Sequence, residues 1–309
     1  MKAVRVHKFG GPDVLVIDEL PIPSPGPGEL LVRLAAAGVG PWDALIREGK
    51  SKVSPPPPLT LGSDLSGVVE ALGSGVAEFK VGDQVYGVTN SEFCGAYAEY
   101  ALASAAMIAR KPSRLTHIEA AAVPVVAVTA WQMLFDYAHA AAGQRILILG
   151  AAGNVGAYVV QLGARAGLHL IATAGPNDTE YVRSLGAETV IDSRAGRFED
   201  SVGPVDAVID TVGGDTQDRS FRTLKPGGIL VTVVSTDPLP ARSDVRTVFF
   251  YADVTMARLE NIRRLLDRGD IVAHVGTVLP LEKARTAHEM LAGAPHKRGK
   301  IVLIVSDKL

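Results

Sequence analysis

The turn at residues 151–156 has the composition of a phosphate-binding loop. Its sequence, Ala-Ala-Gly-Asn-Val-Gly, follows the apolar run 146–149 and opens a segment with helical spacing of apolar residues. Compared with G-x-G-x-x-G, it keeps Gly153 and Gly156 and has Ala151 in place of the first glycine. Backbone N–H groups and the positive end of a helix dipole at such a turn bind pyrophosphate. The pattern predicts a dinucleotide site; the alternative is a buried strand–helix turn without a ligand.

The residues after the next predicted strand indicate which nucleotide is bound. In an NAD site, an Asp or Glu about 20 residues beyond the glycines binds the ribose 2′-hydroxyl. Residues 171–177 contain no acid, and the first one is Asp178, beyond the turn. Because an acid would repel a 2′-phosphate, its absence favours NADP, and we predict NADPH as the cofactor. Possible partners of that phosphate, each of which could equally be a solvated residue, are Asn177, Ser193, Arg183 and Arg194.

The sequence offers no set of ligands for a metal. Catalytic zinc takes three N, S or O ligands, and structural zinc commonly takes four cysteines. Cys94 is the only cysteine, and the seven histidines form no close pair at ligand spacing. We therefore expect no metal, and no zinc in particular.

Signatures of covalent and acid–base catalysis are also missing. The sequence has no G-x-S-x-G motif and no tyrosine followed four residues later by lysine, so the catalytic residues stay unassigned. A hydride carrier alone suits reduction of a quinone or a conjugated enone, because such an acceptor is already electrophilic. Alcohol oxidation fits less well, since it needs a Lewis acid or a strong base on the hydroxyl.

The composition is that of a globular protein with room for two domains. The 309 residues carry a net charge of −2 with no long run of one sign, so nothing indicates a nucleic-acid or anionic-membrane surface. No apolar run reaches the roughly 20 residues of a membrane span. Residues 1–7 alternate like a strand rather than a signal peptide. We expect a cytoplasmic protein with neither nucleic-acid nor membrane partners.

The elements that position these residues follow two patterns. Residues 1 to about 120 are short apolar runs separated by Gly and Pro, which indicates a small, irregular barrel. Helical patterns then appear at 119–123 and 129–142. Beyond them, strands and helices alternate as in a doubly wound parallel sheet. The predicted strands are 146–149, 168–173, 190–192, 205–210, 229–234 and 248–254, and the predicted helices are 155–166, 178–185 and 216–224.

The C-terminal part returns to mixed elements. A helix is predicted at 256–267, a strand at 275–278, an amphipathic helix at 281–291 and a closing strand at 301–305. The closing strand could extend the parallel sheet or return to the barrel, and the pattern does not decide between them.

Ten segments match one family in the family's own order over nearly the whole chain. They include VGDQVYG at 81–87, the glycine turn at 150–156 and GKIVL at 299–303, and the others are 1–4, 9–12, 39–43, 61–69, 95–100, 129–130 and 210–214. The chain thus resembles the medium-chain dehydrogenase/reductase superfamily, in its zinc-independent quinone oxidoreductase (zeta-crystallin-like) branch. The resemblance implies an α/β fold with a GroES-like β-barrel domain and a doubly wound parallel-sheet Rossmann domain. It places the barrel domain at 1–122 with 266–309, the Rossmann domain at 123–265, and the active site in the cleft.

The resemblance also implies which residues contact the ligands. Zinc-dependent relatives carry Cys where this chain has Pro41 or Trp42, and His-Glu where it has Ser63-Asp64. The implied cofactor contacts are Thr129, Ala152, Gly153, Asn154, Val155, Thr173, Gly175, Asn177, Ser193, Val212, Val234, Ser235, Phe249, Phe250 and Tyr251. The implied substrate contacts are Trp42, Asp43 and Arg47.

Two departures from the branch fall on the substrate side. The branch often has Asn where this chain has Gly40, and an aromatic residue where this chain has Lys50-Ser51. Trp42 could supply a flat apolar wall instead, or be a core tryptophan. The resemblance implies an NADPH-dependent quinone or enone reductase. The alternatives are an enoyl-thioester reductase and an NADPH-binding sensor or structural protein without catalysis.

A homodimer is also expected. In this superfamily the last Rossmann strands commonly pair across a dimer, and the segment 248–254 is apolar enough to be such an edge.

Overall fold

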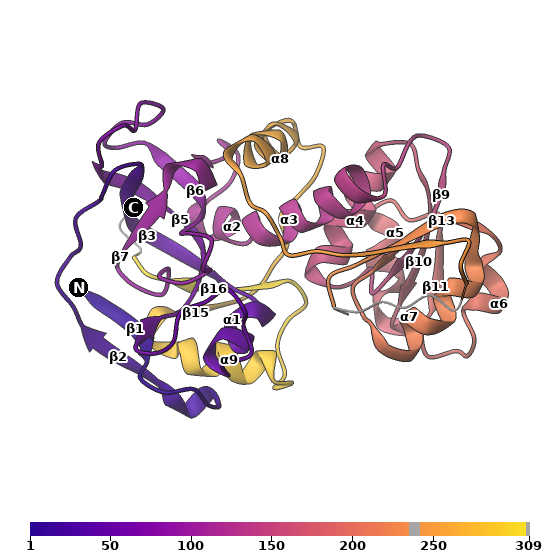
Figure 1. Ribbon diagram of the computed structural model, residues 1–309, viewed down its shortest axis with the longest axis horizontal. Helices are drawn as coiled ribbons and strands as arrows, with labels where there is room; N and C mark the ends of the chain where they lie inside the picture. The colour runs from indigo at the N-terminus through magenta and orange to yellow at the C-terminus, as the bar shows by residue number, and fades with distance from the viewer. Residues whose placement is uncertain (235–241, 307–309) are drawn as a thin grey trace. The chain divides into compact units, whose positions relative to one another are not determined.

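The computed structural model describes residues 1–234 and 242–306 (Figure 1). The chain divides into two compact units. Unit 1 consists of Met1–Val125 and Asp253–Leu309, and unit 2 is the continuous stretch Val126–Ala252. No described helix is long and apolar enough to cross a membrane.

Unit 2 is built on a six-stranded parallel sheet, as the sequence predicts. Its strands are β9 (Arg145–Leu149), β10 (His169–Ala174), β11 (Thr189–Asp192), β12 (Val205–Asp210), β13 (Leu224–Thr232) and β14 (Arg246–Phe249). Their order is β11-β10-β9-β12-β13-β14, and every neighbouring pair is parallel. This is the strand order of a dinucleotide-binding Rossmann sheet. The last strand is shorter than predicted and ends at Phe249.

The helices of unit 2 follow the strands in alternation. They are α4 (Asn154–Arg165), α5 (Thr179–Ser184), α6 (Glu199–Val202) and α7 (Gly214–Ser220), with short 3₁₀ turns at Pro176–Asp178 and Phe221–Thr223. Helix α4 packs on β9 and β10, and α5 packs on β10 and β11. On α4, Val159 and Leu162 are buried as the helical spacing predicts, which anchors the turn before it.

The bounds predicted for the helix at 129–142 are wrong. Helix α3 runs over Pro124–Trp131 and continues as a π-helix over Gln132–Tyr137. Proline suits the first helical position, where its missing N–H costs no hydrogen bond. The β-branched residues that follow Pro124 have low helix propensity, so the sequence pattern hid this start.

Unit 1 contains two sheets. The smaller one has the order β2-β1-β4, from β1 (Lys2–Val6), β2 (Leu15–Glu19) and β4 (Leu59–Thr60). The larger one has the order β15-β16-β3-β5-β6-β8, with β7 also paired to β3. Its strands are β3 (Glu29–Val39), β5 (Asp64–Leu72), β6 (Gln84–Val88), β7 (Tyr100–Ser104), β8 (Ile108–Arg110), β15 (Val275–Pro280) and β16 (Lys300–Ile304). Antiparallel pairing of short strands around β3 confirms the GroES-like domain.

Helices and turns complete unit 1. The helices are α1 (Pro41–Arg47), α2 (His117–Ala121), α8 (Met256–Arg268) and α9 (Ala284–Leu291), with 3₁₀ turns at Pro12–Val14, Ala105–Met107 and Leu281–Lys283. Apolar side chains from both ends of the chain share one core, among them Leu30, Leu34, Leu65, Ile301 and Leu303.

The C-terminal strand joins the barrel and not the parallel sheet. Strand β16 pairs antiparallel with β3, with Ile301 opposite Val39 and Leu303 opposite Ala37. In Figure 1 the yellow C-terminal strand accordingly lies beside the purple strands of unit 1. This resolves the choice that the sequence pattern left open.

Helix α8 also belongs to unit 1, so the domain boundaries differ from those predicted. The Tyr86 hydroxyl donates a 2.7 Å hydrogen bond to the carbonyl of Leu259 on α8. The Asp267 carboxylate, on the same helix, accepts hydrogen bonds from the backbone N–H and hydroxyl of Ser113. Because these contacts tie α8 to β6 and its neighbours, the boundaries lie after Val125 and Ala252, and not after 122 and 265.

Candidate functional site

The glycine turn lies between β9 and α4, and each glycine has a different structural reason. Gly150 has φ = +78°, a conformation that favours glycine. A Cβ atom on Gly156 would lie 2.2 Å from the Gly150 carbonyl oxygen, so the third motif glycine is required for packing. Gly153 is exposed, has φ = −73°, and a Cβ there would meet nothing closer than 3.3 Å. Gly153 thus leaves open space in front of the N-terminus of α4.

A second turn, after β12, packs directly against the glycine turn. The Thr211 hydroxyl donates a 2.7 Å hydrogen bond to the Leu149 carbonyl. The buried Asp210 carboxylate shapes this turn by accepting hydrogen bonds from the N–H groups of Val212 and Gly213, both at 2.9 Å, and from the Thr232 hydroxyl at 2.8 Å. The turns after β9 and β12 are therefore held together at one edge of the sheet.

This pair of turns marks the point where the chain reverses direction across the sheet. Strand β9 lies between β10 and β12, and parallel sheets bind ligands at the carboxyl ends of the strands beside such a reversal. Val212 is 47% exposed and Val234 is 48% exposed, although both are apolar. An exposed apolar surface formed by Val212 and Val234 beside an open turn suits a flat ring joined to a pyrophosphate. The residues thus fit a dinucleotide.

The loops after β10 and β11 form a neighbouring polar site. The Ser193 N–H donates a 2.8 Å hydrogen bond to the carbonyl of Ala174, the last residue of β10, so Ser193 lies beside Gly175. Asn177 and Ser193 are both exposed. The structure thus brings the predicted residues Gly175, Asn177 and Ser193 together.

Three arginines lie near these loops, and they differ in their partners. Arg183 pairs with Glu180 at 2.8 Å, and Arg197 pairs with Glu199 at 3.0 Å. The Arg194 side chain is exposed and forms no hydrogen bond or ion pair with the described residues. Arg194 is therefore the arginine whose charge is open to a phosphate.

The remaining predicted cofactor residues that the structure describes lie on several elements. Ala152, Asn154 and Val155 lie on the glycine turn and the start of α4, and Thr129 is buried on α3. Phe249 and Tyr251 are in edge-to-face contact at the end of β14, and Phe250 is buried against Tyr137. Ser235 lies outside the described residues.

Thr173, one of the implied cofactor contacts, is enclosed within the sheet of unit 2. It is 2% exposed, and its hydroxyl accepts a hydrogen bond from the Gly150 N–H at 3.3 Å. Thr173 therefore supports the glycine turn from within the sheet and offers no free surface to a ligand.

Asp43, predicted on the substrate side, is fully buried at the start of α1. Its Oδ2 atom accepts hydrogen bonds from the Gly40 N–H at 2.8 Å and from the Tyr97 hydroxyl at 3.0 Å. Burial raises the pKa of this carboxyl to about 7, against the opposing effect of the Gly40 hydrogen bond. Asp43 caps the helix, and it is not exposed for a substrate to contact.

Arg47, the third predicted substrate residue, is likewise enclosed. It is 2% exposed, and its guanidinium donates to the Gly10 carbonyl at 3.0 Å, to Nδ1 of His288 at 2.8 Å and to Glu48 at 2.6 Å. Burial, with the Arg47 charge added, lowers the pKa of His288 to about 3. Arg47 therefore links α1 to α9, and its enclosure argues against a direct contact with a substrate.

Trp42 is the one of the three that stays partly exposed. Its indole Nε1–H donates a 3.0 Å hydrogen bond to Ser63 Oγ, and Lys300 Nζ lies 4.1 Å from the ring centroid. Lys300 also forms a fully buried ion pair with Asp64 at 2.9 Å. Asp64 Oδ1 accepts the Val125 N–H at 3.0 Å, near the start of α3.

Sequence reasoning missed Lys300, Tyr97 and His288. Lys300 opens the apolar strand β16, and a lone charge beside a buried strand is the signal that could have found it. Nothing in the local sequence of Tyr97 or His288 indicates their partners, which are distant in the chain.

No group of His, Cys, Asp and Glu side chains that could hold a metal occurs within the described part of the chain. Ser63 and Asp64, where the resemblance places ligands of zinc-dependent relatives, contact an indole and an ammonium group.

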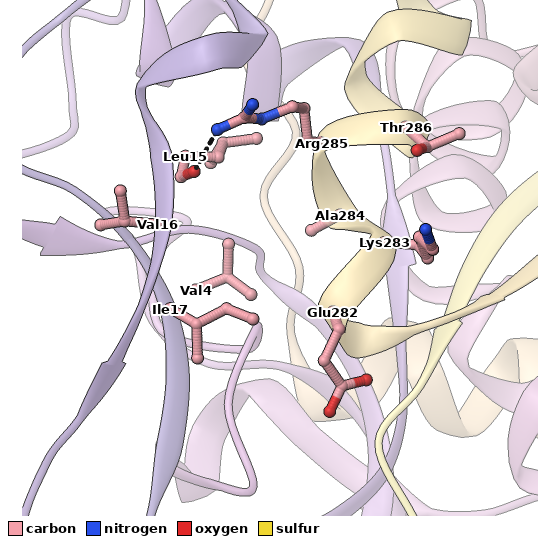
Figure 2. A pocket seen from close by; sticks show the side chains of 9 residues that line it. All are labelled: Val4, Leu15, Val16, Ile17, Glu282, Lys283, Ala284, Arg285 and Thr286. Atoms are coloured by element: carbon pink, nitrogen blue, oxygen red, sulfur yellow. Dashed lines mark hydrogen bonds between the residues drawn. The ribbon is translucent and has the colours of Figure 1, made fainter.

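A hollow of about 420 Å³ lies elsewhere on unit 1, between β2 and the start of α9. Figure 2 shows Arg285 reaching from α9 to the backbone of Leu15, to which it donates a 3.2 Å hydrogen bond. None of the predicted site residues lines this hollow.

Similar proteins agree with this fold. Residues 26–113 match the alcohol dehydrogenase GroES-like domain family, and residues 185–303 match the zinc-binding dehydrogenase family. The quinone oxidoreductase of Sus scrofa is 33% identical over 99% of this chain and 98% of its own. The solved quinone oxidoreductase from Coxiella burnetii is 32% identical, with a TM-score of 0.92 over 99% of both chains.

A metal-containing relative has the same fold. The cobalt- and zinc-bound thermostable alcohol dehydrogenase from Pyrobaculum aerophilum is 30% identical, with a TM-score of 0.87 over 99% of both chains. The fold alone therefore does not distinguish metal-binding members from others.

A GroES-like unit and a Rossmann unit with an open glycine turn define an oxidoreductase of the medium-chain dehydrogenase/reductase superfamily. Within that superfamily, the chain belongs to the quinone oxidoreductase (zeta-crystallin-like) branch.

Proposed function

We propose that this oxidoreductase transfers hydride from NADPH to a quinone or a conjugated enone without a metal. The observation that carries the proposal is the carboxyl edge of the parallel sheet. There the open glycine turn is followed by the end of β10, which carries no acidic residue. This end lies beside Arg194, whose side chain pairs with none of the described residues. This arrangement supports a nucleotide with an extra phosphate on its adenosine ribose.

The residues of unit 2 would each hold a different part of the nucleotide. Gly153 would leave space for the pyrophosphate, and the N-terminus of α4 would bind it, because the first N–H groups of the helix and the helix dipole favour negative charge. Arg194 and Ser193 would bind the 2′-phosphate. Val212 and Val234 would provide the apolar surface beside the nicotinamide. When bound, NADPH supplies the hydride.

The internal pairing of charges in unit 1 supports an electrophilic acceptor. Asp43, Arg47, Asp64 and Lys300 are all buried and bonded to other groups of the protein. None is exposed as a strong base or acid toward an alcohol. A quinone or enone needs none, because water can protonate its oxygen after hydride transfer.

A two-stage titration tests the proposal. Purified protein is titrated with NADPH and with NADH by fluorescence, and 1,4-benzoquinone, 9,10-phenanthrenequinone or crotonyl thioester is then added. We expect tighter binding of NADPH, its oxidation by the quinones, and unchanged rates after EDTA. Turnover of the thioester alone would favour an enoyl-thioester reductase, and tight binding without turnover would favour a non-catalytic protein. Loss of activity with EDTA would contradict metal independence.

A further inference from the structure

Gly40 and Trp42 share one volume. A Cβ atom on Gly40 would lie 2.3 Å from Cη2 and 2.4 Å from Cζ2 and Cζ3 of the Trp42 indole. Gly40 has φ = −133° and ψ = 163°, an extended conformation that any residue can adopt. The indole ring, and not the backbone, therefore requires glycine at position 40.

The indole is fixed from two further directions. Its Nε1–H donates to Ser63 Oγ at 3.0 Å, and Ser63 is completely buried. The Lys300 ammonium lies 4.1 Å from the ring centroid, within the range of a cation–π interaction. A buried hydrogen bond and a nearby charge together specify one orientation of the ring.

A second glycine lies beside Lys300. A Cβ atom on Gly38 would lie 2.3 Å from the Ala121 carbonyl oxygen, 2.9 Å from Asp64 Cβ and 3.0 Å from Lys300 Cε. Glycine is therefore required first by the close approach of the Ala121 backbone, and the missing side chain also leaves room for the ion pair of Lys300 and Asp64, whose nitrogen and oxygen are 2.9 Å apart. Gly38, on β3, leaves room for the ion pair. Gly40, just after β3, leaves room for the indole ring.

We propose that Trp42, fixed by Gly40, Ser63 and Lys300, determines specificity on the substrate side by selecting planar, multi-ring acceptors. This inference rests on the proposed function. The indole excludes any side chain at position 40 and supplies an apolar surface where such a side chain would stand. A planar polycyclic acceptor gains contact area with an aromatic surface, whereas a single-ring acceptor gains little. Lys300 acts through Trp42 and is a positioning residue.

The shared volume is tested by a double-mutant cycle in thermal stability. Gly40→Ala is compared in the Trp42 and Trp42→Ala backgrounds. We expect a clear drop in Tm in the first background and little change in the second, because the clash disappears with the ring. Equal drops in both backgrounds would overturn the coupling.

The specificity is tested by steady-state kinetics with two quinones. Trp42→Leu should raise KM for 9,10-phenanthrenequinone roughly threefold to tenfold, with a smaller change for 1,4-benzoquinone and an unchanged NADPH affinity. Trp42→Phe, which keeps an aromatic ring, should fall between Leu and the wild type. Equal KM changes for both quinones, or none, would overturn the proposal.

The role of Lys300 is tested by spectroscopy as well as kinetics. Trp42 and Trp131 are the two tryptophans, so Trp131→Phe leaves Trp42 as the single reporter. Lys300→Met combined with Asp64→Asn, which avoids an unpaired buried carboxylate, should shift the Trp42 emission and raise KM for phenanthrenequinone. An unchanged spectrum would show that Lys300 does not position the ring.

A failure of the proposed function can be distinguished from a failure of this inference. In the presence of NADP⁺, 9,10-phenanthrenequinone can bind without turnover, and isothermal titration calorimetry then reports its affinity for the wild type and for Trp42→Leu. If the wild type reduces no quinone but binds phenanthrenequinone more tightly than Trp42→Leu does, only the proposed reaction fails. If the wild type reduces quinones and Trp42→Leu binds phenanthrenequinone as tightly as the wild type, the specificity role fails.

Discussion

Nη1 of Arg47 lies 2.8 Å from Nδ1 of His288, joining two buried side chains that are 241 residues apart in the chain. Because a guanidinium can only donate, Nδ1 is the acceptor and the imidazole proton is on Nε2. Nε2 is buried without a hydrogen-bond partner among the described residues, and the Tyr97 ring lies edge-on to the imidazole at 6.0 Å. Neutral His288 therefore holds α9 against α1 by accepting the hydrogen bond from Arg47.

Replacing His288 should test how much this hydrogen bond stabilises the fold. In His288→Leu, the guanidinium loses its acceptor, and we expect a loss of about 1–3 kcal/mol in the free energy of unfolding at pH 7.5, measured with urea. His288→Asn keeps an oxygen near the position of Nδ1 and should lose less. If the two variants are equally stable, the hydrogen bond to Arg47 contributes nothing beyond packing.

Asp43 should make stability depend on pH. Its pKa is about 7 in the folded chain and 3.8 in an ordinary carboxyl, so between these values the folded protein holds a proton that the unfolded chain has released. The free energy of unfolding contributed by this group therefore falls as pH rises from about 4 to 7. His288 has the opposite effect between its folded pKa of about 3 and 6.5, so variants must be compared with the wild type.

Asp43→Asn is the variant that isolates this effect. Its amide oxygen can still accept from Gly40 and Tyr97, but it does not titrate. Relative to the wild type, Asp43→Asn should gain stability steadily as pH rises from 4 to 7, measured by urea unfolding at intervals. A constant difference across that window would contradict the raised pKa.

The glycine turn offers a matched pair of variants. Gly153→Val should abolish NADPH binding, because its side chain would fill the pyrophosphate path, and should lower Tm only slightly, because its Cβ would lie 3.3 Å from the Gly150 carbonyl oxygen, a tight contact that a small shift relieves. Gly156→Ala should instead lower Tm, because its Cβ would meet the Gly150 carbonyl at 2.2 Å. Retained NADPH affinity in Gly153→Val would mean that this turn is not the cofactor site.

Arg194 should determine the preference for NADPH over NADH. Loss of one charge-assisted contact to a phosphate corresponds to roughly tenfold to a hundredfold in affinity, so Arg194→Ala should weaken NADPH by that factor and leave NADH unchanged. Arg183→Ala, whose charge is already paired with Glu180, is the control and should change neither. A similar loss for both nucleotides would remove Arg194 from the 2′-phosphate site.

We also propose a homodimer through β14, which is the edge strand of the parallel sheet. Beyond it, Tyr251 is 55% exposed and in contact with Phe249, so the edge continues into an aromatic surface. An open apolar edge invites pairing with a second copy. Light scattering at micromolar concentration should give the mass of a dimer, and Val248→Lys should shift it toward a monomer. A monomeric wild type would refute this interface.

The parallel sheet could be predicted from sequence because its signals are local. The strand 146–149 was recognisable as an apolar run buried on both faces, and the strand 205–210 from its place in the alternation of strands and helices. Strands β9 and β12 agree with these predictions within one residue. The end of the sheet was harder, because β14 is partly exposed and its apolar run continues beyond the last paired residue, Phe249.

The substrate side could not be predicted in the same way, because its contacts are non-local. Asp43 and Arg47 have the residue types of exposed functional groups, yet Tyr97 and His288 enclose them from distant segments. The departure at Gly40 was visible in the sequence, but its reason was not: the Trp42 ring occupies the space of the missing side chain.

The pairing of β16 with β3 has a consequence for biosynthesis. Unit 1 needs residues from both ends of the chain, whereas unit 2 is one continuous stretch. During synthesis, residues 126–252 can form their parallel sheet as soon as they leave the ribosome. The edge of β3 that receives β16 stays unsatisfied until Lys300–Ile304 has been translated. A nascent chain stalled before Lys300 therefore carries a folded unit 2 and an open barrel edge, which is the species that chaperones would have to protect.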